Sequence, residues 1–490
     1  MSLNAAPSKS AAIRAKLSHP IIDSDGHTVE FEPALQDYIG QVGGSKMPDR
    51  YAAAMRDGAF GWYAMTPKGR RDHRMIRPPW WGLPTKNTLD RATASVPKLL
   101  YERMGDFGLD FTVLYPTVGL FVTSIADDEV RRAATRALNI FHAELFAEYR
   151  DRMTPAAVIP MRTPQEAIEE MEFAVRKLGM KVVMMDSHVQ RPLAAAAKLP
   201  SELAGYARWF DNLVIDSEYD YDPVWAKCVE LKVSPSFHSA GMGWGSRTTT
   251  TNYMYNHIGH FAAAGEALCK ALFMGGVTRR FPTLRFAFLE CGVAWACGLY
   301  SDMIGHWDKR NAKAIDNYNP AHLDRELLLS LLERYGGKLV EGGRLDRFAK
   351  SGGIFTGNAE DGTSLDDWAA CGIEKKSDIK DLFAAPFYFG CEADDPCNAW
   401  AFNAKTNPFK ARLNAVFSSD IGHWDVPDMT EVAEEAYELV EHGLITPDDF
   451  RDFVFTNPVG LWASTNPDFF KGTAVEADVN KLLMPNRVPR

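Results

Sequence analysis

Seven carboxylate and imidazole side chains stand at the ends of apolar segments that are spread over most of the 490-residue chain. These side chains are Asp25, His27, His188, His238, Glu290, Asp420 and His423. Aspartate, glutamate and histidine form a ligand set for a divalent transition metal if the fold brings them together. We therefore expect a metal centre on Asp25, His27, His238, Asp420 and Glu290. The metal would polarise a substrate carbonyl and activate a water molecule.

Catalysis at such a centre also needs groups that accept and return a proton. Glu290 and His188 are the candidate proton acceptors, and Asp420 would act both as a ligand and as a base. Ordinary structural roles remain open for each of them, because a single aspartate after a strand usually caps a helix. For Glu290 the structural alternative is an ion pair with Arg279 or Arg310 that holds the rim of the site together.

Eight short apolar segments can form the strands that position these residues. They cover residues 20–25, 111–116, 156–160, 181–185, 233–238, 284–290, 386–390 and 415–420. Amphipathic stretches lie between them, such as 163–178, which has Thr163 as N-cap and Pro164 at the first helical position. Alternating strands and helices predict an α/β fold with a parallel sheet. Eight such units favour a (β/α)₈ TIM-like barrel. The alternative is an open doubly wound sheet, but the GxGxxG motif of its dinucleotide-binding form is absent from this sequence.

A barrel of this kind explains why the candidate catalytic residues come directly after the predicted strands, since active sites lie at the carboxyl ends of barrel strands. Side chains alternate along a strand, so Asp23, Asp25 and His27 should share one direction. By the same rule, Glu290 should point the same way as Phe288. Both expectations direct the polar groups into one space.

The chain is expected to be a single barrel domain with additions. The barrel spans 19–465, with large insertions at about 40–98 and 312–385. Residues 1–18 are expected to be a flexible N-terminal leader, and 466–490 a C-terminal extension.

Composition excludes several classes of partner. Lys plus Arg number 54 and Asp plus Glu 64, a net charge of −10, which argues against binding to a nucleic acid backbone. No apolar run is long enough to span a membrane, and the N-terminus lacks the pattern of a secretory signal. The seven cysteines include no CxxC pair and are expected to be free thiols in a reducing cytoplasm. We expect a cytoplasmic homo-oligomer that binds a small molecule and neither nucleic acid nor membrane.

Four segments carry a resemblance to a known family. They are IIDSDGHTVE, SFHSAG, FMGGVTRRFPTLRFAFLECGVAW and FSSDIGHWD. With them the chain resembles the amidohydrolase-related (amidohydrolase-2) family of metal-dependent (β/α)₈ barrel enzymes, in the branch with aminocarboxymuconate-semialdehyde decarboxylase-like proteins. The resemblance extends over most of residues 19–465. It implies that Asp25, His27, His238 and Asp420 are metal ligands.

The sequence departs from the family pattern at three places. Asp25 and His27 form an acid-x-His pair, where His-x-His is commoner. Glu290, followed by Cys291 and Gly292, stands where many decarboxylases and hydrolases of the family have an acid/base histidine. No lysine closes the fourth strand, so the carbamylated lysine of two-metal amidohydrolases has no counterpart.

Three enzymatic interpretations follow, all with one or two ions of zinc, manganese or iron. The first is an amidohydrolase-like enzyme that hydrolyses a carbonyl or C–C bond of an aromatic or apolar organic acid through metal-activated water. The second is non-oxidative decarboxylation at the same metal. The third is a non-heme diiron oxygenase, a hydroxylase, because carboxylate-rich sets can hold two irons that activate O₂. A barrel that has lost turnover is a fourth, non-enzymatic alternative.

Five further residues are candidates for contact with the substrate. They are Trp80, Trp81, His257, His260 and His423. His257 and His260 are three residues apart and would share one face of a helix. The Trp- and Arg-rich segment 62–82 is expected to cover the mouth of the barrel, where its rings and cations would suit an acidic aromatic substrate.

Overall fold

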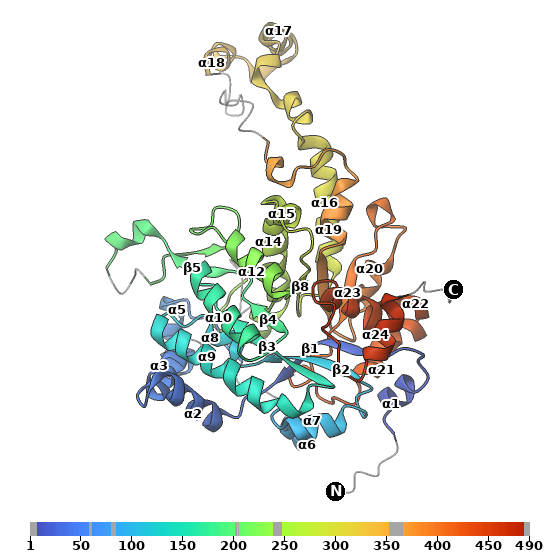
Figure 1. The fold of residues 1–490 in the computed structure, drawn as a ribbon. Helices are drawn as coiled ribbons and strands as arrows, with labels where there is room; N and C mark the ends of the chain where they lie inside the picture. Colours follow the sequence, from blue (N-terminus) through green and yellow to red (C-terminus); the bar gives the residue numbers. More distant parts are fainter. Residues whose placement is uncertain are drawn as a thin grey trace.

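The computed structural model describes residues 7–57, 61–79, 85–200, 203, 205–238, 247–351 and 366–484. Eight of its strands form one parallel sheet in the order β1-β2-β3-β4-β7-β8-β9-β10 (Figure 1). Their bounds are β1 Ile22–Thr28, β2 Phe111–Pro116, β3 Met153–Ile159, β4 Val182–Met185, β7 Pro235–Phe237, β8 Phe286–Phe288, β9 Phe387–Cys391 and β10 Asn414–Phe417. Each overlaps one of the eight segments predicted from the sequence.

Two backbone hydrogen bonds bring the end of the sheet back to its beginning. The amide of His27 donates to the carbonyl of Ile421 at 2.7 Å, and the amide of Asp420 donates to the carbonyl of Asp25 at 2.9 Å. The sheet is therefore a nearly closed barrel. The predicted α/β barrel is confirmed, and the open doubly wound alternative is wrong.

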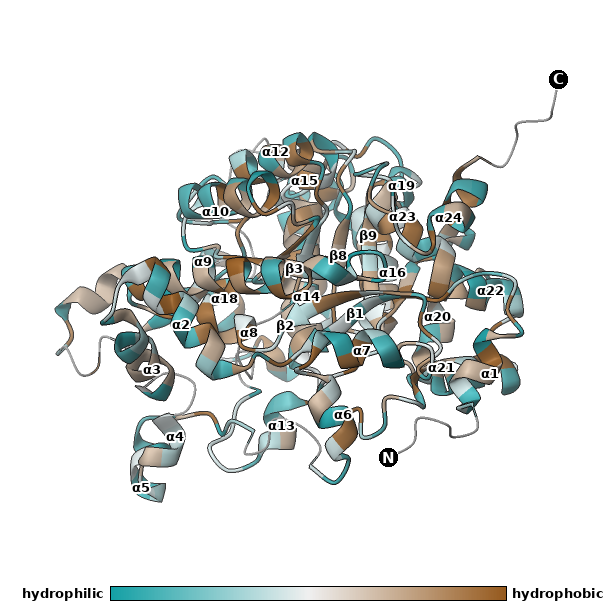
Figure 2. Cartoon of the chain, turned by 60° about the horizontal axis from the view of Figure 1, so that its bottom comes forward, coloured by the Kyte–Doolittle hydropathy of each residue, from teal (hydrophilic) through white to brown (hydrophobic). Residues whose placement is uncertain are grey.

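The strands form the interior of the molecule. Every residue of β1 to β4 and of β7 to β9 is buried, and in β10 only Asn414 is partly exposed. Strands that helices cover from outside read as continuous apolar runs, as most of these do; β1, with the sequence IDSDGHT, is the exception. Figure 2 shows hydrophobic residues gathered around the strands and hydrophilic ones on the outer turns of the helices.

The longer helices follow the strands and surround the barrel. They are α9 Asp128–Leu145, α10 Pro164–Arg176, α12 Asp222–Leu231, α14 His260–Met274, α16 Ala294–Arg310, α21 Val432–Glu441 and α23 Asn457–Ala463. The start of α10 confirms the predicted cap, because the hydroxyl of Thr163 accepts a hydrogen bond from the amide of Glu166 at 3.2 Å. Pro164 at the first helical position has no amide hydrogen to leave unbonded.

Shorter helices fill the connections. They are α8 Gly119–Val122, α13 Tyr253–His257, α15 Val277–Arg280, α20 Ala399–Phe402, α22 Pro447–Arg451 and α24 Glu476–Leu483, with a π-helix at Asp452–Thr456. A two-stranded antiparallel hairpin, β5 Val189–Pro192 with β6 Arg208–Asp211, was not expected. Its strands have only four residues each, and half of these residues are polar, so the sequence gives little hydrophobic pattern from which to predict them.

The N-terminal region and the first insertion are mostly helical. Their helices are α1 Lys9–Arg14, α2 Glu32–Gly43, α3 Met47–Asp57, α4 Gly61–Ala64, α5 Pro67–Asp72, α6 Thr88–Thr93 and α7 Pro97–Arg103. Helix α1 lies within the segment expected to be a flexible leader, yet it is docked. Ser10 is fully buried, and its hydroxyl accepts from the amide of Glu434, while Lys9 pairs with the Glu434 carboxylate.

The second insertion forms an arm that projects away from the barrel beyond α16 (Figure 1). Helices α17 Arg325–Tyr335 and α18 Arg344–Ser351 have no buried residue. Helix α19 Asp378–Ala384 returns to the barrel, where Ile379 and Phe383 are buried. The far part of the arm therefore does not shape the strand ends.

Two expectations from composition can be compared with the structure. In the described part of the chain, no helix combines the length and the apolar character needed to cross a bilayer. All seven cysteines are described, and all are free thiols, as predicted.

Candidate metal centre

The carboxyl ends of β1, β7, β8 and β10 bring together the residues predicted as ligands. Asp25 and His27 lie on β1, and His238 directly follows β7. Glu290 stands two residues after β8, and Asp420 three residues after β10. All five side chains therefore meet at one end of the barrel.

The ring of His27 is the centre of the inner group of donors. Its Nε2 lies 3.6 Å from Asp25 Oδ1, 3.3 Å from Asp420 Oδ1 and 3.3 Å from His238 Nε2. Ligands of one tetrahedral ion lie about 3.3 Å from each other, given metal–ligand bonds of about 2.0–2.1 Å. His27 thus lies at ligand spacing from each of the other three predicted ligands, and the donor atoms of Asp25, His27 and His238 also lie within 4.8 Å of one another.

Burial tests whether a metal fits this set. Asp25, His27 and His238 are fully buried, and Asp420 is 2% exposed. The oxygens of Asp25 and Asp420 and Oε2 of Glu290 make no hydrogen bond of normal geometry, and their close contacts are with histidine nitrogens of the same group. Buried carboxylate oxygens without partners are costly unless a cation or proton compensates them. The residues present therefore fit a divalent metal ion.

The pKa values of the imidazole side agree with ligand chemistry. Burial, and then the charges of His423 and His238, hold the pKa of His27 well below its usual value. The ring is therefore neutral at pH 7, which is the form that binds a metal. For Glu290, burial opposes ionisation, but His238 and His423 outweigh it and hold its pKa well below the usual range.

The other carboxylates show the opposite shift. Burial, and then the charge of Glu290, raise the pKa of Asp25 well above its usual value. Burial, and then Asp425 and Glu290, do the same for Asp420. Several carboxylates confined in one buried space repel each other, and a bound cation removes this penalty.

Glu290 reaches the centre by an unexpected route. The strand ends at Phe288, and Glu290 has a left-handed backbone with φ of 50°, so strand alternation does not set its direction. Its Oε2 lies 2.9 Å from His238 Nε2. The structural alternative, an ion pair with Arg279 or Arg310, is therefore wrong, because the ion-pair partners of Glu290 are histidines.

Asp420 has the same left-handed conformation, with φ of 51°. A non-glycine residue in this region carries strain of about 1–3 kcal/mol, and such residues cluster at functional sites. Glu290 and Asp420 thus share a conformation that turns each carboxylate off its strand toward the centre.

Asp23 does not join the other acids of β1. A β-bulge between Asp23 and Gly26 breaks the alternation on which its expected direction depended. Its carboxylate instead accepts hydrogen bonds from the hydroxyl of Thr112 at 2.6 Å and from the amide and hydroxyl of Ser419 at 2.9 and 2.8 Å. Asp23 therefore ties β1 to its neighbouring strands.

Sequence comparison places this geometry in a family. A sequence model of the amidohydrolase family matches residues 62–316, a little over half of the chain. The chain belongs to the amidohydrolase family. The resemblance inferred from the four segments is thereby confirmed.

Several solved structures are similar to this amidohydrolase at low identity. An amidohydrolase from Mycobacterium avium subsp. paratuberculosis K-10 has 15% identity and a TM-score of 0.48, covering 91% of this chain and 100% of that one. A dihydroxybenzoic acid decarboxylase from Polaromonas sp. JS666, with bound manganese and 2-nitroresorcinol, has 15% identity and a TM-score of 0.46 over 92% and 99%. A 2,6-dihydroxybenzoate decarboxylase from Rhizobium has 15% identity and a TM-score of 0.45 over 91% and 98%.

His423 belongs to the donor set of this amidohydrolase, although only a substrate contact was expected of it. Its ring stacks on that of His27, with centroids 3.5 Å apart, and its Nδ1 lies 2.8 Å from Asp420 Oδ1. It also lies 3.6 Å from Glu290 Oε1. Its place three residues after Asp420 was the signal in the sequence.

Two acids that were not predicted as ligands lie next to this group. They are Glu392 and Asp425. Each has a carboxylate oxygen within 4.8 Å of a Glu290 oxygen, and these two oxygens lie within 4.8 Å of each other. Glu392 was expected to be a solvated acid of the rim, and no role was expected for Asp425. Glu392 is exposed and directly follows β9, so a strand end marks it, whereas Asp425 lies eight residues after β10 and carries no such signal.

His188 is not among the donors that the structure groups together. It lies between β4 and β5, and its ring meets that of Phe210 edge-on at 5.0 Å. Burial, followed by the charge of His260, lowers its pKa to about 4. A role for His188 as proton acceptor stays a prediction.

His257 and His260 do not share one helix, because Gly259 separates α13 from α14. Their rings are nevertheless neighbours, with centroids 5.2 Å apart. His257 also meets Trp424 at 5.0 Å, and Phe261 connects this group to His238 at 5.2 Å. Aromatic rings therefore line one side of the centre.

The described part of the first insertion contacts the segment that leads into this aromatic group. The indole N–H of Trp62 donates a hydrogen bond to the carbonyl oxygen of Thr250 at 2.9 Å. The backbone amide of Arg77 donates one to the carbonyl oxygen of Thr249 at 3.1 Å. This segment directly precedes α13, so the insertion lies beside the mouth. Trp80 and Trp81, the predicted substrate contacts, lie outside the described residues.

Replacing Trp62 by alanine should therefore affect substrate binding more than stability. Loss of its one hydrogen bond and of the Arg70 guanidinium stacked 3.4 Å from its ring should raise KM about 2–10-fold. Steady-state kinetics and the melting temperature measure the two effects, with Trp400→Ala, an exposed tryptophan of α20, as control. An unchanged KM would exclude the insertion from substrate binding.

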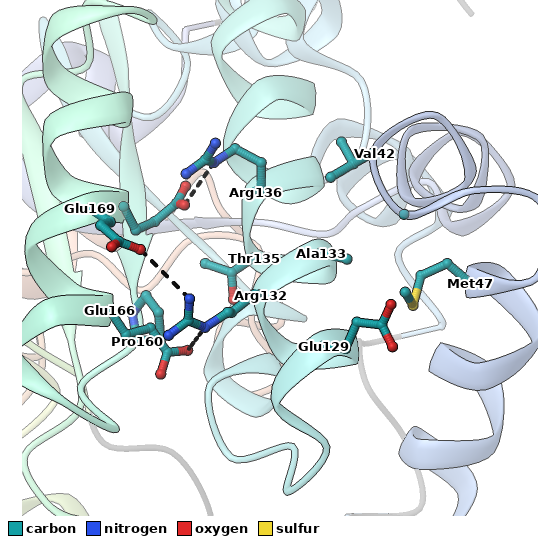
Figure 3. Close-up of a pocket in the computed structure, with 12 residues that line it drawn as sticks. Val42, Met47, Glu129, Arg132, Ala133, Thr135, Arg136, Pro160, Glu166 and Glu169 are labelled. Atoms are coloured by element: carbon teal, nitrogen blue, oxygen red, sulfur yellow. Dashed lines mark hydrogen bonds and ion pairs between the residues drawn. The ribbon is translucent and has the colours of Figure 1, made fainter.

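A surface cavity of about 390 Å³ lies elsewhere, between the outer helices α9 and α10 and the residues around α2 and α3 (Figure 3). The charged residues that line it already form ion pairs, most of them with each other. Arg132 lies 3.6 Å from Glu169, and Arg136 lies 2.7 Å from Glu170. No member of the donor set lines it. We assign it no role in catalysis.

Proposed function

We propose that this amidohydrolase is a metal-dependent enzyme that removes CO₂ from an organic acid without an oxidant. The burial of the donor set carries the proposal, since Asp25, His27 and His238 are fully buried and Asp420 nearly so. A substrate carboxylate that leaves water for such a site loses its hydration, which favours loss of CO₂. Hydrolysis, in contrast, requires water to enter the same space.

The chain's own residues have separate tasks in this reaction. Asp25, His27, His238 and Asp420 would hold the metal, which stabilises negative charge on the substrate oxygens. Glu290, as an ionised carboxylate, would pass on the proton that replaces CO₂ on carbon in exchange with His423, whose Nδ1 lies 3.6 Å from Glu290 Oε1. The aromatic side of the centre would orient a planar, conjugated acid.

The donor set also supports a second candidate function. Three carboxylates and three histidines in contact are typical of metal pairs that activate O₂, so hydroxylation by a non-heme diiron centre is the alternative. Hydrolysis through activated water remains the third. The free thiols favour a cytoplasmic location for any of these reactions.

Product analysis separates these reactions. The protein, loaded with Mn²⁺, is incubated with carboxyl-¹³C-labelled hydroxyaryl acids in ¹⁸O-labelled water, with and without O₂. Decarboxylation predicts one ¹³CO₂ per product molecule at equal rates with and without O₂, and no ¹⁸O in the organic product. Product containing ¹⁸O without CO₂ release would establish hydrolysis, and a strict need for O₂ would establish oxygenation; either would overturn the proposal.

A further inference from the structure

Glu290 directs its two carboxylate oxygens at two different histidines. Oε2 lies 2.9 Å from His238 Nε2, in the inner group, and Oε1 lies 3.6 Å from His423 Nδ1, farther out. A carboxylate that serves only one ion has no need of donors on both sides. This arrangement is that of a bridge between two neighbouring binding positions.

Asp420 repeats the pattern from the other side. Its Oδ1 lies 3.3 Å from His27 Nε2 and 2.8 Å from His423 Nδ1. His27, Glu290, Asp420 and His423 each offer a donor atom within 4.8 Å of the others. This outer group shares His27 with the inner group of Asp25, His27 and His238, whose donor atoms meet the same limit.

The outer group contains buried atoms that make no hydrogen bond of normal geometry. They are both oxygens of Asp420 and Nδ1 of His423. Glu290 is 8% exposed and Asp420 2%. Asp425 Oδ1, on the outer side, also lacks a partner. Buried nitrogen and oxygen atoms without hydrogen bonds are suitable ligands for a cation.

The site holds more carboxylates than one ion needs as ligands. Five carboxylates lie in or beside the two donor groups, on Asp25, Glu290, Glu392, Asp420 and Asp425. Within the described residues, no lysine or arginine forms an ion pair with any of them. One divalent ion balances only two negative charges, so the site has carboxylates to spare for a second ion.

We propose that a second divalent transition-metal ion binds beside the first, between His423 and the bridging carboxylates of Glu290 and Asp420. Asp425 and Glu392 complete its outer side. The mixture of imidazole nitrogen and carboxylate oxygen suits manganese, iron or zinc. The site does not depend on which reaction the enzyme performs. Only one consequence rests on the proposed function, namely that the outer ion would give the substrate carboxylate a cation to approach.

Metal binding without substrate tests the second site. Metal-free full-length protein is titrated with Mn²⁺, and bound metal per chain is measured together with the electron paramagnetic resonance spectrum. We expect two Mn²⁺ per chain and a spectrum of two exchange-coupled ions. His423→Ala should bind one Mn²⁺ and lose the coupling, whereas His257→Ala, the control on the same side of the centre, should bind two. One Mn²⁺ per wild-type chain at saturation would overturn the proposal.

A milder variant tests the second metal site if His423→Ala does not fold. Asp425→Asn should keep two sites but weaken the second about 10–100-fold, as the loss of a supporting group does at metal sites. Asp394→Asn, an exposed acid beside Glu392, should leave both affinities unchanged. Equal affinities in Asp425→Asn and wild type would contradict the assigned position. These readouts need no turnover, so they stand apart from any failure of the proposed decarboxylation.

Discussion

Replacing Asp420 by asparagine is expected to lower kcat/KM by about 10²–10⁴ and to remove most of the bound metal. Asp420 is the carboxylate that contacts both His27, at 3.3 Å, and His423, at 2.8 Å. The asparagine amide has the same size as the aspartate carboxylate but no negative charge. The substitution should therefore weaken metal binding and slow proton transfer. Kinetics with saturating Mn²⁺ and metal analysis measure both losses.

The control for this change is Asp428→Asn in the same segment. Asp428 accepts hydrogen bonds from the amide and hydroxyl of Thr430 and is not a member of the donor set. It should keep its metal and a rate close to that of the wild type. If Asp420→Asn also keeps full metal occupancy and rate, Asp420 is not a ligand.

The second large effect is expected for Glu290→Gln, with a loss of about 10²–10⁴ in kcat and a melting temperature close to that of the wild type. Glutamine retains the shape of the side chain, but it cannot exchange a proton with His238 and His423 or bridge two ions. The variant Glu266→Gln, whose carboxylate lies on the surface of α14 and pairs with Lys270, is the control.

A purely structural role of Glu290 makes the opposite prediction. Its removal would then lower the melting temperature and leave the rate per folded molecule unchanged. Thermal unfolding and active-site titration together distinguish these outcomes. The pair with His238 at 2.9 Å in a buried site favours the catalytic role.

The barrel could be predicted because buried parallel strands carry a strong pattern. Each of the eight apolar runs overlaps a strand of the barrel, and the family model matches the segment that contains the motif around His238. That Asp25, His27 and His238 lie together could be predicted for the same reason, since the carboxyl ends of barrel strands converge. Their role as metal ligands stays a prediction.

Other features depend on backbone detail that a pattern does not carry. The bulge after Asp23 and the left-handed residues Glu290 and Asp420 change where side chains point, and no residue type marks them. His423 and Asp425 approach the centre because the chain after β10 folds back over it. Helix α1 differs from the expected leader because its contacts come from a segment more than 400 residues away.

Anomalous X-ray scattering from crystals grown with Mn²⁺ tests the central claim most directly. We predict a manganese peak about 2.0–2.3 Å from the nearest atoms of Asp25, His27, His238 and Asp420, at the carboxyl ends of the barrel strands. Absence of any peak at these four residues, in crystals that contain manganese elsewhere in the protein, would contradict it.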